Sequence, residues 1–146
     1  MITDRAAVAQ IGVQVAGPLA LVVTAFLFFA GHNQPGGGFA AGLVLGAVVA
    51  VRTVVGLARP RDAVTLLGAG GLVAGATALA PLLWGEVFLD QVVVDGELPA
   101  LGTVKTGTAL VFDAGVALIV VGLVVAVLNG LGADELGSAD PRESSP

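Results

Sequence analysis

Apolar residues fill this chain in four long runs, and polar residues interrupt them at only a few places. No Asp, Glu, Lys or Arg occurs between residues 6 and 51, and residues 31–39 form the only polar break in that stretch. A helix needs about 20 predominantly apolar residues to cross the hydrocarbon core of a bilayer. The pattern therefore predicts an all-α integral membrane protein with four transmembrane helices, at about 6–30, 38–58, 63–84 and 106–131.

The composition supports a membrane protein of one domain. Hydrophobic residues make up 56% of the 146 residues and charged residues 12%, and the mean hydropathy is +0.99. Residues 1–132 are predicted to form the four-helix domain, and residues 133–146, which lack apolar periodicity, a disordered acidic cytoplasmic tail. The run at 6–30 is too long for the apolar part of a signal peptide, so it reads as a retained first helix. The net charge of −5 comes without a basic patch, so no nucleic-acid partner is expected.

The basic residues predict an orientation. Five arginines fall on one side of a four-helix arrangement and only Lys105 on the other, which by the positive-inside rule puts both termini in the cytoplasm. Arg52 lies near the cytoplasmic end of the second helix, from which its side chain can snorkel to the interface. The segment at 85–105 is too acidic to cross and faces outward, where Asp95-Gly96 indicates the turn of a small hairpin.

Small residues recur every four positions on two of the predicted helices. The second helix carries Gly38, Gly42 and Gly46, and the third carries Gly71 and Gly75. This spacing lets helix backbones approach closely. It fits internal packing of the four-helix unit or docking against other membrane subunits, and both can hold.

A polar stripe follows one face of the first helix. It contains Gln10, Gln14, Gly17 and Thr24. A polar packing seam is the favoured interpretation, with an ion pathway as the alternative. Pro18 interrupts the backbone hydrogen bonding of this helix and predicts a kink.

Asp113 is the only acid between Glu97 and Asp134, and it lies inside the fourth helix. A carboxylate at that depth is costly unless it is neutral, paired or hydrated. A structural role, in which it pairs with a neighbouring element or subunit, is slightly favoured over a place on the proton or ion path.

The loop between the first two helices carries a lone histidine and three glycines. His32 has no second ligand at metal spacing, so neither a metal nor a cofactor is predicted. The glycines lack the Lys-Ser/Thr ending of a phosphate-binding loop. They are expected to adopt positive φ angles or to contact backbone too closely for a Cβ, with Pro35 fixing the turn. Since no nucleophile–base pair occurs either, an enzyme is not expected.

Two segments resemble one family. The string Gly31-His32-Asn33-Gln34-Pro35-Gly36-Gly37-Gly38-Phe39 resembles the signature of the MnhB or MrpB component of multisubunit Na+/H+ antiporters, and residues 101–116, with Phe112-Asp113, resemble that family's second motif. Ala41 and Ala117 depart from the family pattern, at positions where a glycine and an aromatic residue are common.

The resemblance implies an accessory subunit of a cation/proton antiporter in the cytoplasmic membrane. Its partners would be large A- and D-type subunits and small membrane subunits, with Na+ and H+ handled by the whole complex in membrane lipid. The alternative is a scaffold subunit of a redox-driven complex such as a membrane-bound hydrogenase. The residues expected to serve the ion path or subunit packing are Asp113, His32, Asn33, Pro35, Gly36, Gly37, Gly38, Phe39 and Gln14.

Overall fold

Four helices long and apolar enough to cross a membrane dominate the computed structural model, which describes residues 2–31, 36–58, 62–90, 93–98 and 102–132. The predicted all-α class with four transmembrane helices is confirmed. A two-stranded hairpin lies between the last two helices. In chain order the elements are α1 (Ile2–Ala30), α2 (Gly37–Val54), α3 (Ala63–Leu79), the short 3-10 helix η1 (Ala80–Trp84), β1 (Val93–Leu98), β2 (Gly102–Gly107) and α4 (Thr108–Gly130).

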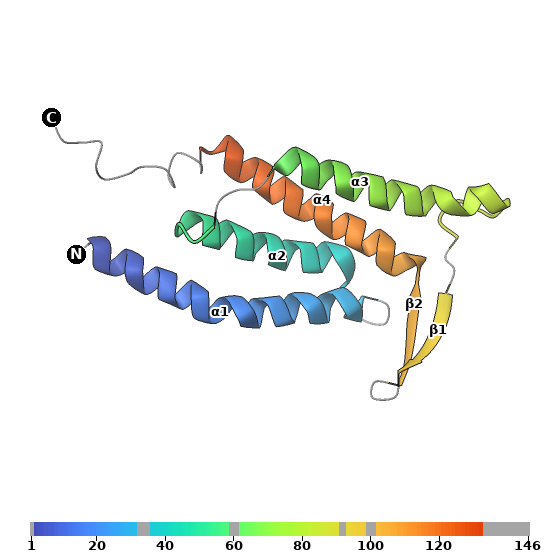
Figure 1. Ribbon diagram of the computed structural model, residues 1–146, viewed down its shortest axis with the longest axis horizontal. Helices are drawn as coiled ribbons and strands as arrows, with labels where there is room; N and C mark the ends of the chain where they lie inside the picture. The colour runs from blue at the N-terminus through green and yellow to red at the C-terminus, as the bar shows by residue number, and fades with distance from the viewer. Residues whose placement is uncertain (1, 32–35, 59–61, 91–92, 99–101, 133–146) are drawn as a thin grey trace.

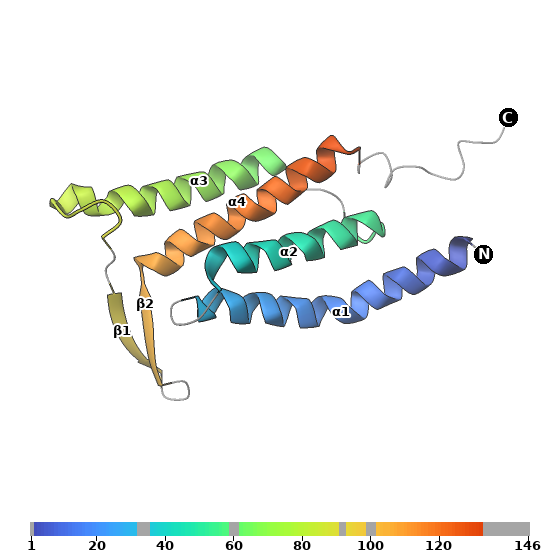
Figure 2. The same cartoon turned by 180° about the vertical axis from the view of Figure 1, so that it is seen from behind.

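The helices form one open row rather than a closed bundle (Figures 1 and 2). Helix α1 packs on α2, α2 on α4, and α4 on α3, so that α1 and α3 are the two edges of the row. Helix α1 begins and α4 ends at the same end of the row, and the hairpin lies at the other end (Figure 1). An even number of crossings therefore returns the chain to the side from which it started.

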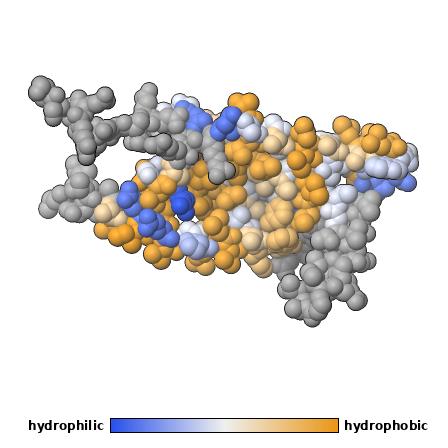
Figure 3. All heavy atoms as spheres, in the orientation of Figure 1, coloured by the Kyte–Doolittle hydropathy of each residue, from blue (hydrophilic) through white to orange (hydrophobic). Residues whose placement is uncertain are grey.

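The edge helix α1 buries little of its own surface. Only 6% of its most apolar 18-residue window is buried, against 33% for α2. Apolar side chains cover much of the face seen in Figure 3. Helix α1 also bends near its middle, where Pro18 lies inside the helix (Figure 1). The row thus leaves a broad apolar surface for lipid or for other subunits.

Glycines on α2 bring its backbone against α4. A Cβ added at Gly42 would lie 2.9 Å from the Cβ of Val120 and 3.0 Å from the Cα of Ala117, and one at Gly46 would lie 2.9 Å from a methyl carbon of Val124. Real Cβ atoms do not come so close to their neighbours. The predicted column on α2 is therefore an internal seam, as close helix packing in membranes requires.

The corresponding seam on α3 runs through different residues from those predicted. A Cβ at Gly70 would lie 2.7 Å from the carbonyl oxygen of Gly115, and one at Gly115 would lie 2.6 Å from the backbone nitrogen of Ala74. A Cβ at Gly71 or Gly75 would meet nothing within 4 Å. These two glycines face away from α4, so internal packing does not account for them.

Helix ends differ from the prediction by a few residues, for local reasons. Helix α2 ends at Val54 rather than at 58, because Gly56 adopts a left-handed φ of 74°. The third span tightens into η1 after Leu79, with Pro81 near its start, and Pro81 has no N–H to continue an α-helix. Helix α4 begins at Thr108 because β2 continues to the preceding residue.

The outer hairpin exists, but the predicted position of its turn is wrong. Asp95 pairs with Lys105 and Gly96 with Val104 inside the antiparallel ladder. Because the ladder bonds occupy the backbone groups there, a tight turn cannot form at Asp95-Gly96. The two strands are connected by residues 99–101, which lie outside the described part of the chain.

Candidate functional site

The two motifs that are far apart in the sequence meet in the structure. Asp113 of α4 lies beside the first residues of α2, where a Cβ added at Gly37 would come within 3.1 Å of the Asp113 carboxylate oxygen Oδ2. A Cβ at Gly38 would overlap the backbone carbonyl oxygen of Asp113. Both glycines are buried, and Asp113 is partly buried. The glycine loop and the membrane acid therefore form one packed unit, which we call the Gly–Asp113 contact.

Backbone geometry explains the glycines of this contact. Gly37 has a φ of 86°, which an L side chain rarely adopts. A Cβ at Gly36 would lie 2.6 Å from the carbonyl oxygen of Leu27, and a Cβ at Gly31 would collide with Gly37. The expectation of a positive φ or of contacts too close for a Cβ is confirmed. The chain folds back tightly between the end of α1 and the start of α2.

The electrostatics of the contact favour a carboxylate. The first N–H groups of a helix have no acceptor within that helix, and they carry a partial positive charge. Gly36 precedes α2 and provides no side-chain cap. Asp113 therefore supplies negative charge at the positive end of α2, from a different helix. Among the described residues, no group of three or more His, Cys, Asp or Glu side chains could hold a metal ion.

The remaining predicted site residues are not brought to this contact. Phe39 follows the glycines but points outward, with 59% of its surface exposed. Gln14 is exposed on α1, whereas Gln10 donates a hydrogen bond of 2.9 Å from Nε2 to the carbonyl oxygen of Val55. The polar stripe on α1 is thus only partly a seam with α2. Three further residues of the prediction lie outside the described part of the chain: His32, Asn33 and Pro35.

One charged residue has a position that sequence reasoning missed. Arg52 was expected to reach the interface, but its guanidinium also lies against α1, where a Cβ at Gly17 would be 3.6 Å from Nη1. It lines the end of a long apolar groove. The buried Gly17 on the polar stripe of α1 was the available signal, since a glycine there leaves room for a side chain from the next helix.

These features define the class of protein: a small multi-pass membrane protein whose first loop is locked onto its last helix. Comparison with known proteins gives the family. The sequence profile described as "Domain related to MnhB subunit of Na+/H+ antiporter" matches residues 8–126, and the chain belongs to this family.

Individual relatives agree with the family. The chain is 34% identical over 122 residues to the MnhB-type component of the Na(+)/H(+) antiporter of Bacillus subtilis, covering 79% of this chain and 85% of that protein. It is 33% identical over 122 residues to the corresponding Na(+)/H(+) antiporter component of Alkalihalophilus pseudofirmus, covering 80% and 85%.

A solved structure is similar over almost the whole chain. The match is to a chain in the structure of the Mrp complex from Dietzia sp. DQ12-45-1b, with a TM-score of 0.72 and 30% sequence identity. It covers 99% of this chain but only 15% of that chain. The fold described above therefore also occurs as a small part of a much longer polypeptide.

Proposed function

We propose that this protein is an accessory membrane subunit of a multisubunit antiporter that exchanges a monovalent cation, Na+ in the first instance, for H+. The observation that carries the proposal is the similarity of the whole fold to part of a chain of the Mrp complex. The names of the relatives, which describe components of Na(+)/H(+) antiporters, point the same way. The partners would be the large A- and D-type subunits and the small membrane subunits of that complex.

The charges of the membrane spans support an accessory role. Within the four spans that the structure describes, Asp113 is the one acid and Arg52 the one base. A proton path across a membrane needs a relay of ionisable or hydrated groups, and a single acid cannot form one. The relatives compared above are transport proteins rather than enzymes. The hydrogenase-type scaffold is not favoured, because those relatives are antiporter subunits.

Two transport measurements test the proposal. The purified chain, reconstituted into liposomes with an imposed Na+ gradient, should produce no proton counter-movement. Everted membrane vesicles that contain the complete complex should show Na+-dependent dissipation of a proton gradient, and removal of this one subunit should abolish it. Antiport by the isolated chain, or full antiport without the subunit, would refute the accessory role.

The orientation is a part of the proposal that rests on the arginine count. Both termini and the connection between α2 and α3 would be cytoplasmic, and the hairpin would face outward. The two termini-bearing helix ends lie at the same end of the row, as this requires (Figure 1).

For Asp113 we favour a structural role over proton carriage. The carboxylate lies against the positive end of α2, where it stabilises the Gly–Asp113 contact. Asp113→Asn keeps a hydrogen-bonding oxygen, so the complex should assemble and retain much of its antiport. Asp113→Leu, of similar size but without that oxygen, should reduce assembly. An assembled Asn variant without antiport, rescued in part by Glu, would instead put Asp113 on the proton path.

The exposed polar and aromatic residues of the prediction suit subunit packing. Gln14 exposes an amide on a membrane span, and an unpaired amide in lipid is unfavourable. Phe39 is exposed at the same end of α2 as the glycine loop. Both would contact partner subunits. A cysteine at Gln14 should cross-link to another subunit of the assembled complex, and a cysteine that reacts only with lipid-soluble reagents would argue against this contact.

A further inference from the structure

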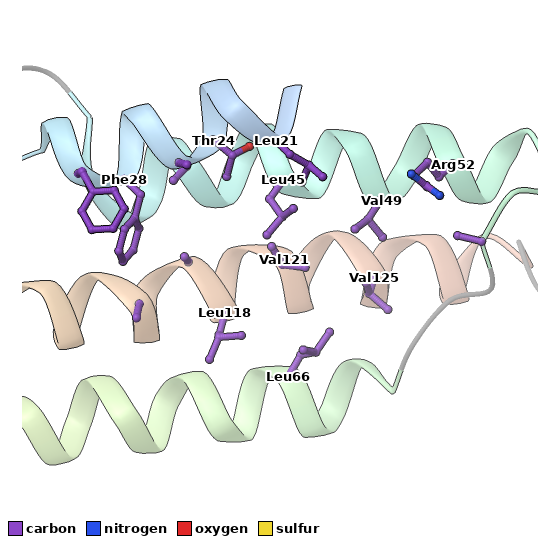
Figure 4. Close-up of a pocket in the computed structure, with 16 residues that line it drawn as sticks. Leu21, Thr24, Phe28, Leu45, Val49, Arg52, Leu66, Leu118, Val121 and Val125 are labelled. Atoms are coloured by element: carbon purple, nitrogen blue, oxygen red, sulfur yellow. The ribbon is translucent and has the colours of Figure 1, made fainter. Parts of the chain in front are cut away.

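A long apolar groove runs along one face of the helix row (Figure 4). It has a volume of about 820 Å³ and is lined by residues of all four helices and by Ala58. Of its sixteen lining residues, Thr24 and Arg52 alone have polar side chains. The Thr24 hydroxyl donates a 2.8 Å hydrogen bond to the carbonyl oxygen of Ala20, so it is already satisfied within α1. Arg52 is therefore the one charged group that the groove offers.

The charge lies at one end of the groove and aromatic rings at the other. Figure 4 shows Phe28 and Arg52 at opposite ends, with Leu45 and Val49 between them. Arg52 is partly buried, and the described residues form no ion pair with it. Its guanidinium is held against α1, where the buried Gly17 makes room. An arginine fixed in this way presents a planar array of donors to an anion.

The length of the groove matches one leaflet of a bilayer. On α2 the groove runs from Ala41 to Arg52, which at the helical rise corresponds to about 16 Å. Half of a hydrocarbon core is about 15 Å thick. Because Arg52 is two residues from the end of α2, its guanidinium lies near the level of the lipid headgroups on that side.

We propose that this groove binds an anionic phospholipid, with the phosphate at Arg52 and the acyl chains along the apolar wall. Arginine forks bind phosphate with two parallel hydrogen bonds, and basic pockets between transmembrane helices bind anionic headgroups. The lipid supplies both the anion and the apolar chain that the groove lacks. This site does not depend on the antiporter function.

A transmembrane helix of a partner fits the groove less well. A helix about 10 Å wide would occupy roughly 1,250 Å³ over a length of about 16 Å, which exceeds the groove. Such a helix would also have to bring a carboxylate to Arg52 at the headgroup level. A phospholipid has its phosphate at that level already.

Native mass spectrometry of the full-length chain in a nonionic detergent tests the site. The probes are dioleoyl phosphatidylglycerol and dioleoyl phosphatidylcholine, which differ in headgroup charge and share their acyl chains. One favourable arginine–headgroup contact predicts about fivefold tighter binding of phosphatidylglycerol. Arg52→Gln should abolish this preference, Arg52→Lys should keep part of it, and the control Arg142→Gln should not change it.

A second variant tests the apolar wall without touching the charge. Ala25 is exposed and lines the groove from α1, so Ala25→Trp should fill the groove and weaken the binding of both lipids. Val22→Trp, exposed on the same helix but not lining the groove, is the matched control and should bind normally. Should Arg52→Gln not fold, the wild-type preference, Arg52→Lys and Ala25→Trp still decide.

Three results would overturn the proposal. They are equal binding of the two lipids by the wild-type chain, an unchanged preference in Arg52→Gln, and unchanged binding in Ala25→Trp. Efficient cross-linking of a cysteine at Ala25 to a partner subunit in the assembled complex would assign the groove to a helix instead. None of these results bears on whether the complex carries out antiport, so the two proposals fail separately.

Discussion

Replacing Gly42 by alanine tests whether the glycine column of α2 is an internal seam. The new Cβ would lie 2.9 Å from Val120 Cβ and 3.0 Å and 3.1 Å from the Cα and carbonyl oxygen of Ala117. Ordinary van der Waals contact begins near 3.4 Å. Two of the three neighbours are backbone atoms, which no rotamer change can move. Helices α2 and α4 must therefore separate by several tenths of an ångström.

The magnitude follows from two opposing effects. Overpacking a well-packed interface costs about 1–3 kcal/mol, while a helical Gly→Ala change stabilises the helix by about 1 kcal/mol. Gly75→Ala is the matched control, because it is also inside a helix and a Cβ there would meet nothing within 4 Å. It should keep the helix gain without the clash. The difference between the two variants removes the helix effect, and it should be about 1–3 kcal/mol.

Unfolding of the full-length chain in mixed micelles by increasing SDS, followed by the loss of helical circular dichroism, measures this difference. Gly42→Ala should unfold at lower SDS than Gly75→Ala, with the unfolding equilibrium constants differing by about fivefold or more. Equal stability of the two variants would refute the seam. If Gly75→Ala leaves the isolated chain stable but reduces its incorporation into the complex, the outer face of α3 is a contact with another subunit.

Three further predictions concern the loop, the start of α3 and the orientation. Gly37→Val should impair assembly or activity of the complex, because valine rarely adopts the φ of 86° and would press on the Asp113 carboxylate, while Gln34→Ser should be tolerated; full activity of the valine variant would end the argument for glycine there. Asp62 caps α3, and hydrogen bonds from Thr65 lower the pKa of Asp62 below its ordinary value, so the cap is fully present above about pH 4 and is lost as the pH falls through the lowered pKa. Asp62→Ala should accordingly speed amide hydrogen exchange in the first turn of α3 at neutral pH, Asp62→Asn should do so less, and an unchanged exchange rate in the alanine variant would exclude the cap. Cysteines at Gln91 and Ser138 should react with an impermeant thiol reagent from outside and from inside respectively, and the reverse pattern would invert the orientation.

The number and the limits of the membrane spans could be predicted because they depend on local composition. A run without charges must be long enough to cross, and residues 6–51 with one polar break leave little choice. The errors lie at helix ends, where one residue decides. Gly56 turned left-handed and ended α2 early, and Pro81 changed the type of helix that follows α3. The hairpin turn was misplaced because a two-residue turn signal is weaker than six paired residues on each strand.

The order of the helices in the row could not be predicted, and the roles of individual glycines depend on it. Gly70 and Gly71 are adjacent in the sequence, yet one is pressed against α4 and the other meets nothing. In lipid both faces of a helix are apolar, so hydrophobic periodicity does not identify the face that packs. The sequence did indicate that Asp113 had a small-residue surrounding, but not that the surrounding came from the glycine loop.

The Gly–Asp113 contact explains why two motifs that lie far apart in the sequence occur together in this chain. The glycines remove side chains from the start of α2, and that removal is useful only if another helix fills the space. The fourth helix does so with its backbone and with one carboxylate, which meets unpaired N–H groups that lipid could not satisfy. A substitution in either motif therefore exposes polar groups of the other to an apolar medium. The same contact fixes α4 to α2 at one end of an open row, and it leaves α1 and the outer face of α3 free to meet lipid or other subunits.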